Sequence, residues 1–260
     1  GSFMNSVFNG KIIENTPFEN VYISHSPSDV GNSIGAALYV AHNLKNENRN
    51  ISFNSSYLGP SFSDEEIQKT LERRKIVYDK IADIPSTVAD ILSRGEIIAR
   101  FSGRMEFGER ALGNRSILAD PRPENMKDKI NAIIKYRERY RPFAPVIPQN
   151  KVHKYFDVPE TFTCPYMEKV VPIKKEFQKE LPAVTHVDGS GRVQTVSEKH
   201  NLSFYQIIKE FESLTGFPIV LNTSFNIAGE PVVLSPDDAL TTFYNSGLEY
   251  VIIGSFLVKK

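Results

Sequence analysis

The chain has few of the features that would point to secretion or to a membrane. It contains one cysteine, Cys164, so no internal disulfide can form, and we expect a reducing compartment. No apolar run approaches the roughly 20 residues that are needed to cross a bilayer. The N-terminus also lacks the charged start and apolar stretch of a signal peptide. We therefore expect a soluble, cytoplasmic protein with no membrane partner.

The chain also has no excess of charge of one sign. Its 31 basic and 31 acidic residues balance, so whole-protein electrostatics gives no reason to expect a nucleic acid as partner. No catalytic triad is recognisable. The histidines show no short metal-ligand spacing; they are His25, His42, His153, His186 and His200.

Helical and extended patterns alternate along the chain. Asp29 precedes a helix that starts with small residues, and Ser63 and Glu66 fit a capping box. The same kinds of pattern predict a strand at 21–27, helices at 86–95, 123–135, 201–216 and 235–247, a buried strand at 217–225, and a strand pair or one bent strand at 248–260. Because strands and helices mix throughout, the predicted class is α/β or α+β.

Cations gather in "KYRERYRPFAP". If this run is extended, the two-residue period of side chains places Lys135, Arg137, Arg139 and Arg141 on one face. Pro142 disfavours a helix at Arg141, so we expect at least the end of the run to be extended. Such a face is either a solvated charged edge or a pocket for a phosphate or carboxylate.

A second stretch, "ARFSGRMEFGERALGNRSILADPR", interleaves arginines with Gly103, Gly108 and Gly113. Glycines at this spacing suit a loop whose N–H groups and arginines converge on an anion. An equally good alternative is a structural loop pinned by ion pairs with Glu106 and Glu109. The arginines concerned are Arg100, Arg104, Arg110, Arg115 and Arg122.

Polar residues follow a predicted buried strand in "LNTSFNIAGEPVV", which contains Asn222, Ser224 and Asn226. This is a usual location for ligand-binding groups in α/β folds, although an Asn/Ser-rich turn can also satisfy its own backbone. A further motif, "HVDGSGRVQTV", places Asp188 and Arg192 around a tight glycine turn.

The block "GRMEFGERALGNRSILADPR" resembles the signature of the ATP-dependent O-carbamoyltransferases that modify antibiotics and nodulation factors. Glu109 stands where proline is usual in that family. "KYRERYRPFAP", "VDGSGRVQTV" and "LNTSFNIAGEPVV" resemble the family's next blocks in the same order, so the resemblance covers roughly residues 95–260. The first fifty residues resemble the end of the family's N-terminal domain.

The resemblance implies three segments. Residues 1–53 would be the C-terminal remnant of a Kae1-like domain, which has an actin/Hsp70-like ATPase fold. Residues 54–85 would be a linker and helix, and residues 86–260 a YrdC-like domain, a twisted mixed sheet with helices. Asp29 matches an iron ligand of the full-length ATPase-like domain, whose histidine ligands would lie upstream of this chain.

The resemblance also implies an activity: binding of carbamoyl phosphate and Mg-bound ATP, formation of carbamoyladenylate, and transfer to a hydroxyl of a small-molecule acceptor. We expect this chain alone to be incomplete for the transfer. Two alternatives stay open: a non-catalytic nucleotide- or phosphate-binding module, and an RNA-associated YrdC-like domain. Neutral charge and the lack of basic–aromatic motifs argue against RNA.

Matched residue by residue, the family's motifs imply a binding site. Lys135 and Arg141 would be the cations for carbamoyl phosphate, with Ser224 completing the pocket, and replacing Lys135 is expected to weaken binding with little loss of fold. The implied contacts to substrate or nucleotide are Arg110, Arg137, Arg192, Asn222 and Asn226. Arg139 is expected to be surface charge.

Overall fold

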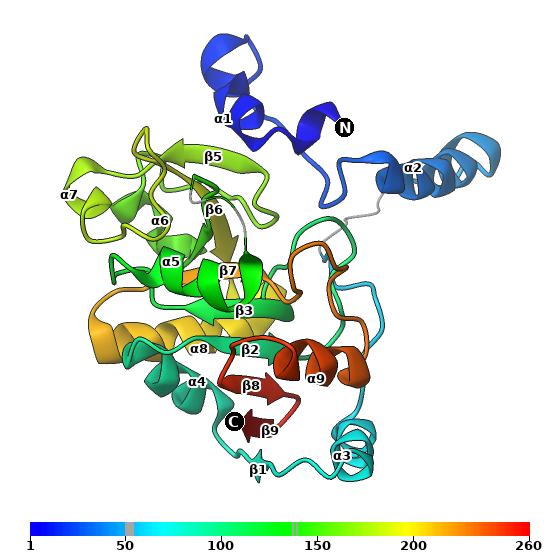
Figure 1. The fold of residues 1–260 in the computed structure, drawn as a ribbon. Coiled ribbons are helices and arrows are strands. Elements are labelled where there is room, and N and C mark those ends of the chain that lie inside the picture. Colours follow the sequence, from blue (N-terminus) through cyan, green and yellow to red (C-terminus); the bar gives the residue numbers. More distant parts are fainter. Residues whose placement is uncertain (50–54, 137, 139) are drawn as a thin grey trace.

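The structure is a computed structural model that describes residues 1–49, 55–136, 138 and 140–260, and its centre is a mixed sheet. The strands are β1 (Asp79–Lys80), β2 (Ile98–Phe101), β3 (Arg115–Ala119), β4 (Ala144–Pro148), β5 (Lys169–Pro172), β6 (Ser190–Val196), β7 (Val220–Ser224), β8 (Tyr250–Ile253) and β9 (Phe256–Lys259). Their order is β1-β9-β8-β2-β3-β7-β4-β6-β5 (Figure 1). β2 is parallel to β8 and β4 to β6, while the other neighbours are antiparallel. The predicted mixed α/β class is confirmed.

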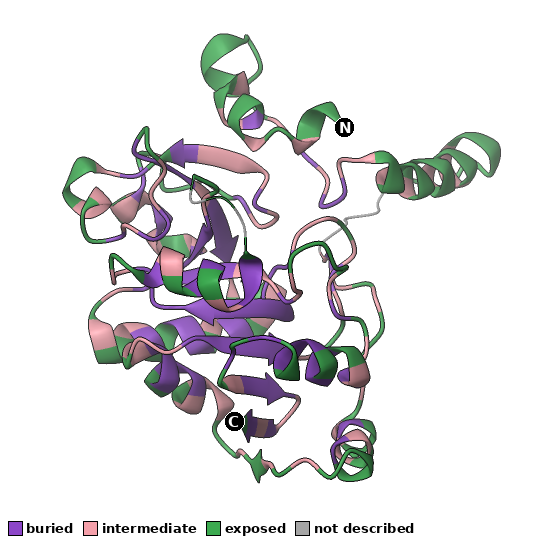
Figure 2. Ribbon diagram, viewed as in Figure 1, coloured by how far each residue is buried: buried purple, intermediate pink, exposed green. Residues whose placement is uncertain are grey.

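Helices cover both faces of this sheet. The α-helices are α1 (Ser6–Asn15), α2 (Asn32–Tyr39), α3 (Asp64–Arg73), α4 (Ile84–Ser93), α5 (Met126–Ile130), α6 (Val152–Tyr155), α7 (Lys175–Gln178), α8 (Glu198–Thr215) and α9 (Pro236–Tyr244). Short 3-10 or π turns are η1 (Ser2–Met4), η2 (Asp29–Gly31), η3 (Val40–Leu44), η4 (Asn131–Lys135) and η5 (Gln149–Lys151). Neighbouring residues of a strand point to opposite faces. Val220 accordingly joins the core under α4 and α8, and Leu221 joins the core under α5 and α9. Figure 2 shows the central strands as the buried part of the molecule.

Local sequence signals fix several helix ends as predicted. Ser63 Oγ accepts from the Glu66 N–H, and Glu66 Oε2 accepts from the Ser63 N–H at 2.7 Å, which completes the capping box of α3. Gly95 and Gly216 follow α4 and α8 with left-handed backbones, φ 76° and 78°. These positions favour glycine because a Cβ would crowd the neighbouring carbonyl.

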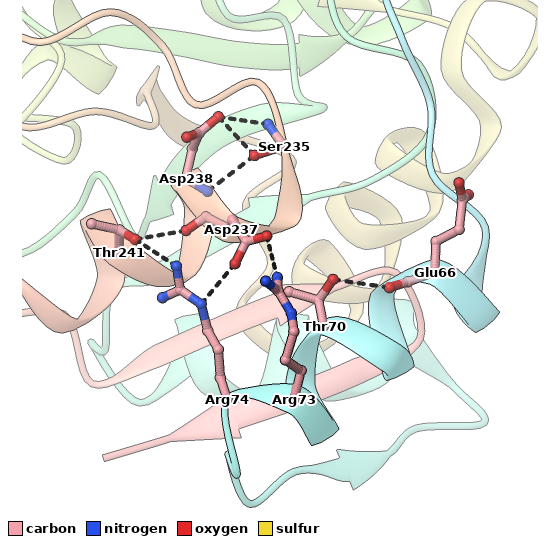
Figure 3. A network of polar contacts seen from close by, with 8 residues as sticks. All are labelled: Glu66, Thr70, Arg73, Arg74, Ser235, Asp237, Asp238 and Thr241. Atoms are coloured by element: carbon pink, nitrogen blue, oxygen red, sulfur yellow. Dashed lines mark hydrogen bonds and ion pairs between the residues drawn. The ribbon is translucent and has the colours of Figure 1, made fainter.

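Charged side chains join α3 to α9 (Figure 3). Arg74 Nε lies 2.7 Å from Asp237 Oδ1, and Arg74 Nη2 donates to Thr241 Oγ1 at 3.0 Å. Ile67 and Leu71 on α3 are buried in the same core as the sheet. The helix predicted after the linker is therefore packed onto the sheet domain. The predicted boundary at residues 53–54 lies outside the described residues.

The N-terminal residues differ from two expectations. The strand predicted at 21–27 is wrong: these residues form irregular backbone, and no strand among the described residues pairs with them. Asp29 is also not a helix cap. It lies in the first turn of η2, after Ser28, whose side chain makes no capping bond.

The segment before this irregular stretch packs on the sheet edge. α1 contacts β5, and Asn9 Nδ2 donates to the Glu168 carbonyl at 2.9 Å. A Cβ at Gly10 would lie 2.1 Å from the Val170 carbonyl oxygen, so the close approach requires glycine. α2 projects away from the sheet and is largely exposed (Figures 1 and 2). Within the described ranges, no helix has both the length and the apolar character to cross a membrane.

Candidate functional site

The basic run does not form one extended face. Lys135 is the last residue of the π-helical turn η4, and Tyr136 follows with a left-handed backbone, φ 44°. The Arg141 N–H donates to the Glu138 carbonyl at 3.1 Å, so the end of the run is a turn. The expectation that the end of the run is extended is therefore wrong, and because the helical turn continues through Lys135 the condition for four cations on one face is not met. Arg137 and Arg139 lie outside the described residues.

Lys135 contacts two of the polar residues predicted to share its site. Its Nζ lies 2.6 Å from the Ser224 carbonyl oxygen and 3.3 Å from Ser224 Oγ. It also lies 2.9 Å from the Asn226 carbonyl oxygen and 2.7 Å from Asn226 Oδ1. Ser224 Oγ in turn donates to Asn226 Oδ1 at 2.6 Å. The end of η4 and the end of β7 thus place a cation, a hydroxyl and an amide within one hydrogen-bonded group, which we call the Lys135 cluster (Lys135, Ser224 and Asn226).

Asn222 lies one step earlier on β7 and is buried. Its Nδ2 donates to the Ala111 carbonyl at 3.0 Å and to Gln194 Oε1 at 2.9 Å, while Gln194 Nε2 donates to the Leu112 carbonyl at 3.0 Å. These amides hold the arginine–glycine loop against β6 and β7. Sequence reasoning did not select Gln194, although the two-residue period of a strand places it on the same face as Arg192.

The register of the sheet places Arg192 near the same end. Asn222 pairs with Ala144 of β4, and Val146, two residues further on, pairs with Gln194 of β6. Continuing the parallel register back by two residues places Arg192 beside Ala144. Asn222 and Arg192 therefore flank β4 in one row, and Ser224 lies one side-chain step beyond Asn222.

Two other predicted site residues, Arg141 and Arg110, have their described contacts elsewhere. Arg141 is on an exposed turn, where its Nε lies 3.6 Å from Glu138 Oε2. Arg110 lines a small pocket with Met4, His25 and Glu168. Burial lowers the pKa of Arg110, and the neighbouring carboxylate of Glu109 opposes that shift.

The arginine–glycine loop binds an anion of its own. Glu106 Oε1 accepts the N–H groups of Leu112 at 2.7 Å and Asn114 at 2.8 Å, and that of Arg115 at 3.4 Å. The N–H groups of the loop thus converge on a buried carboxylate of this chain. The expected ion pairs of Glu106 and Glu109 with arginines are replaced by these N–H contacts and by a hydrogen bond from Ser28 Oγ to Glu109.

Most arginines of this stretch are also engaged within the fold. Arg100 donates to the Gly113 carbonyl and to Asn114 Oδ1, and Arg115 donates to the Ser102 carbonyl at 2.8 Å. Burial lowers the pKa of both guanidinium groups to about 10. Arg104 donates to the Leu58 and Gly59 carbonyls, and Arg122 donates to the Asp120 carboxylate. These four arginines are thus held within the fold, but by carbonyls, Asn114 and Asp120 rather than by the predicted ion pairs with Glu106 and Glu109.

Gly113 offers a direct test of how tightly this loop is packed. Its φ is +119°, and a Cβ there would lie 2.4 Å from Phe204 Cδ1. We expect Gly113→Ala to destabilise the protein by about 2–3 kcal/mol in urea unfolding, because strain and overpacking add. Gly95→Ala is the matched control. Gly95 also has a positive φ, +76°, but no atom lies within 4 Å of an added Cβ, so we expect this substitution to destabilise the protein by only about 1 kcal/mol. Equal losses for both variants would contradict the packing argument.

Asp29 does not complete a metal site in the part of the chain that the structure describes. It is exposed on η2, and these residues hold no group of three His, Cys, Asp or Glu side chains that could bind a metal ion. One carboxylate is too few ligands for iron or zinc.

Comparison with known proteins identifies relatives along almost the whole chain. Residues 89–260 match the family model described as carbamoyltransferase C-terminus. The nodulation protein NolNO of Sinorhizobium fredii is 41% identical over 98% of this chain and 38% of its own length. NolO of Bradyrhizobium diazoefficiens is 40% identical over 98% of this chain and 47% of its own length. Nodulation protein U of Rhizobium fredii is 34% identical over 88% of this chain and 37% of its own length.

The chain spans less than half the length of these curated relatives. Among solved structures, full-length HypF in a phosphate- and nucleotide-bound form aligns with a TM-score of 0.42 and 17% identity, over 66% of this chain and 21% of HypF. That similarity is too low to assign a site.

Proposed function

The chain belongs to the family of carbamoyltransferase C-termini, and from this premise we propose that it binds carbamoyl phosphate and Mg-bound ATP and forms carbamoyladenylate. One water is consumed, carbamoyl phosphate releases its phosphate, and ATP releases pyrophosphate. In the longer protein, the carbamoyl group would pass to a hydroxyl of a small-molecule acceptor. The observation that best supports this proposal is the Lys135 cluster. It combines a buried ammonium group with the hydroxyl of Ser224, the last residue of β7, and the amide of Asn226 just beyond it.

The Lys135 cluster has the chemistry that an acyl phosphate requires. Forming a mixed anhydride moves negative charge between phosphate oxygens, and a fixed cation lowers the barrier by positioning and by stabilising that charge. Neutral carbonyl, hydroxyl and amide oxygens of Ser224 and Asn226 accept hydrogen bonds from Lys135 Nζ. These bonds fix the position of the ammonium group, so a phosphate bound at this end of β7 would meet a preorganised positive charge.

The other proposed residues extend this site. Arg141 would be the second cation, and because its pair with Glu138 is long and exposed, exchanging Glu138 for a phosphate should cost little. Arg192 and Asn222, which flank β4, would face the nucleotide or phosphate. The proposed contacts of Arg110 and Arg137 rest on the family motifs alone.

The domain assignment is also part of the proposal. Residues 1–53 would belong to a larger ATPase-like domain. Several large apolar side chains in this segment are exposed, as expected of a surface that packs against further structure; they are Phe3, Phe8, Phe18, Tyr22, Tyr39 and Leu44.

Pyrophosphate release tests the chemistry. We expect the chain to release pyrophosphate from ATP only when carbamoyl phosphate is present. Binding of both ligands without any release would favour the non-catalytic module. Carbamoylation of an aminoglycoside or sugar by this chain alone would contradict the expectation that transfer needs the longer protein.

RNA association is tested separately. We expect no tight tRNA retention in a filter-binding assay, because the formal charge is balanced. Tight, salt-sensitive retention would support the RNA-associated alternative instead.

A further inference from the structure

Three polar side chains are linked by hydrogen bonds at the start of β6: His186, Asp188 and Ser190. Ser190 Oγ donates to Asp188 Oδ1 at 2.6 Å, and the Ser190 N–H donates to the same oxygen at 3.0 Å. His186 Nδ1 lies 3.0 Å from Ser190 Oγ. His186 Nε2 is buried and has no hydrogen-bond partner among the described residues.

The contacts fix which nitrogen of His186 carries the proton. Asp188 is exposed, and its hydrogen bonds from Ser190 lower the pKa of the carboxyl group, although its slight burial opposes them, so it is ionised and can only accept. Ser190 has one hydroxyl hydrogen, and it donates this hydrogen in the bond to the Asp188 carboxylate. His186 Nδ1 must therefore donate to Ser190 Oγ, and Nε2 keeps a lone pair.

The groups around the imidazole keep it neutral. Burial lowers the pKa of His186; Asp188 raises it, and the positive charges of Arg192 and Lys127 lower it further. Near pH 7, His186 is thus a neutral hydrogen-bond acceptor whose imidazole is influenced by the positive charges of Arg192 and Lys127.

These residues lie at the same end of the sheet as the Lys135 cluster. The pairing with β7 ends at Ala144, the first residue of β4. Extending the same register by two residues would bring Ser224 level with Ser190, the first residue of β6, on the other side of β4. Two strand spacings separate them, or about 10 Å between backbones. Lys127 lies on α5, the helix that leads directly into Lys135.

Carbamoyl phosphate needs an acceptor as well as cations. Its phosphate accepts hydrogen bonds, but its amino group only donates them, and lysine and arginine side chains have no acceptor to offer. Resting on the carbamoyl phosphate site proposed above, we propose that His186 Nε2 accepts a hydrogen bond from the carbamoyl NH2 group. Ser190 and Asp188 act as positioning residues that hold the acceptor tautomer.

The experiment compares carbamoyl phosphate with acetyl phosphate, which has a methyl group in place of the amino group. The wild-type chain is expected to bind carbamoyl phosphate about tenfold more tightly, the effect of one well-placed hydrogen bond. His186→Phe is expected to abolish this preference while its affinity for acetyl phosphate stays near the wild-type value. His186→Gln, which keeps an acceptor oxygen, should retain part of the preference.

Ser190→Ala provides a second variant that leaves the imidazole in place. It should reduce the preference, because Nδ1 loses the acceptor that fixes its proton. A role in folding alone would leave the ratio of the two affinities unchanged. An unchanged preference in a folded His186→Phe chain, or no preference in the wild type, overturns the role of His186. Binding of neither acyl phosphate by the folded wild type would instead overturn the proposed function itself.

Discussion

Glu106→Ala is expected to lower the free energy of unfolding by about 3–5 kcal/mol, because it leaves buried N–H groups without an acceptor. The carboxylate receives the N–H groups of Leu112 and Asn114 at under 3 Å, and Arg115 also approaches it. Burial lowers the pKa of Arg100 and Arg115, and the negative charge of Glu106 opposes that shift. Removing the carboxylate therefore also leaves two buried cations with less compensation.

Urea unfolding measures this loss, and Glu106→Gln separates its two causes. Glutamine keeps an acceptor oxygen for the loop but has no charge, so Glu106→Gln should lower the free energy of unfolding by less than Glu106→Ala. Glu124→Ala, at an exposed position, is the control and should leave the midpoint unchanged. A Glu106→Ala midpoint equal to that of the wild type would show that the loop does not depend on this carboxylate.

Lys135→Met is expected to weaken carbamoyl phosphate binding about a hundredfold, the value of a hydrogen bond between charged groups. The same change should lower the free energy of unfolding by about 2–4 kcal/mol, since oxygens of Ser224 and Asn226 lose their donor. Lys135 is 4% exposed and donates to both residues. The sequence alone led us to expect that replacing Lys135 would cost little stability. Because Lys135 is buried, we now expect a measurable loss.

Lys129→Met is the matched control for Lys135→Met. Lys129 lies on α5 and makes a surface pair with Glu96 at 3.4 Å, so its loss should alter neither affinity nor stability appreciably. Binding is compared at a temperature where both variants are folded by circular dichroism. Wild-type affinity in the Lys135 variant would exclude this lysine from the site.

Local signals explain why much of the fold was predictable. The capping box at Ser63 and Glu66 and the glycines that end α4 and α8 depend on residues a few positions apart. The strand at Val220–Ser224 follows from a continuous apolar run before a polar loop. The family motifs selected Lys135, Ser224 and Asn226, and the structure brings these three together.

The incorrect expectations concern contacts between distant parts of the chain. Residues 21–27 have strand-like composition, but a strand also needs a partner, and none lies beside them among the described residues. A helical turn places Lys135 against β7, whereas the prolines downstream suggested extended backbone. The spacing of arginines and glycines could not reveal that the anion in their loop is Glu106.

The most direct test of the account is a calorimetric titration of the wild-type chain with carbamoyl phosphate, alone and with a non-hydrolysable ATP analogue. We predict saturable binding of carbamoyl phosphate that is about a hundredfold weaker in Lys135→Met and unchanged in Lys129→Met. The absence of binding by a well-folded wild-type chain, with and without the analogue, would contradict the claim that this chain carries the carbamoyl phosphate site.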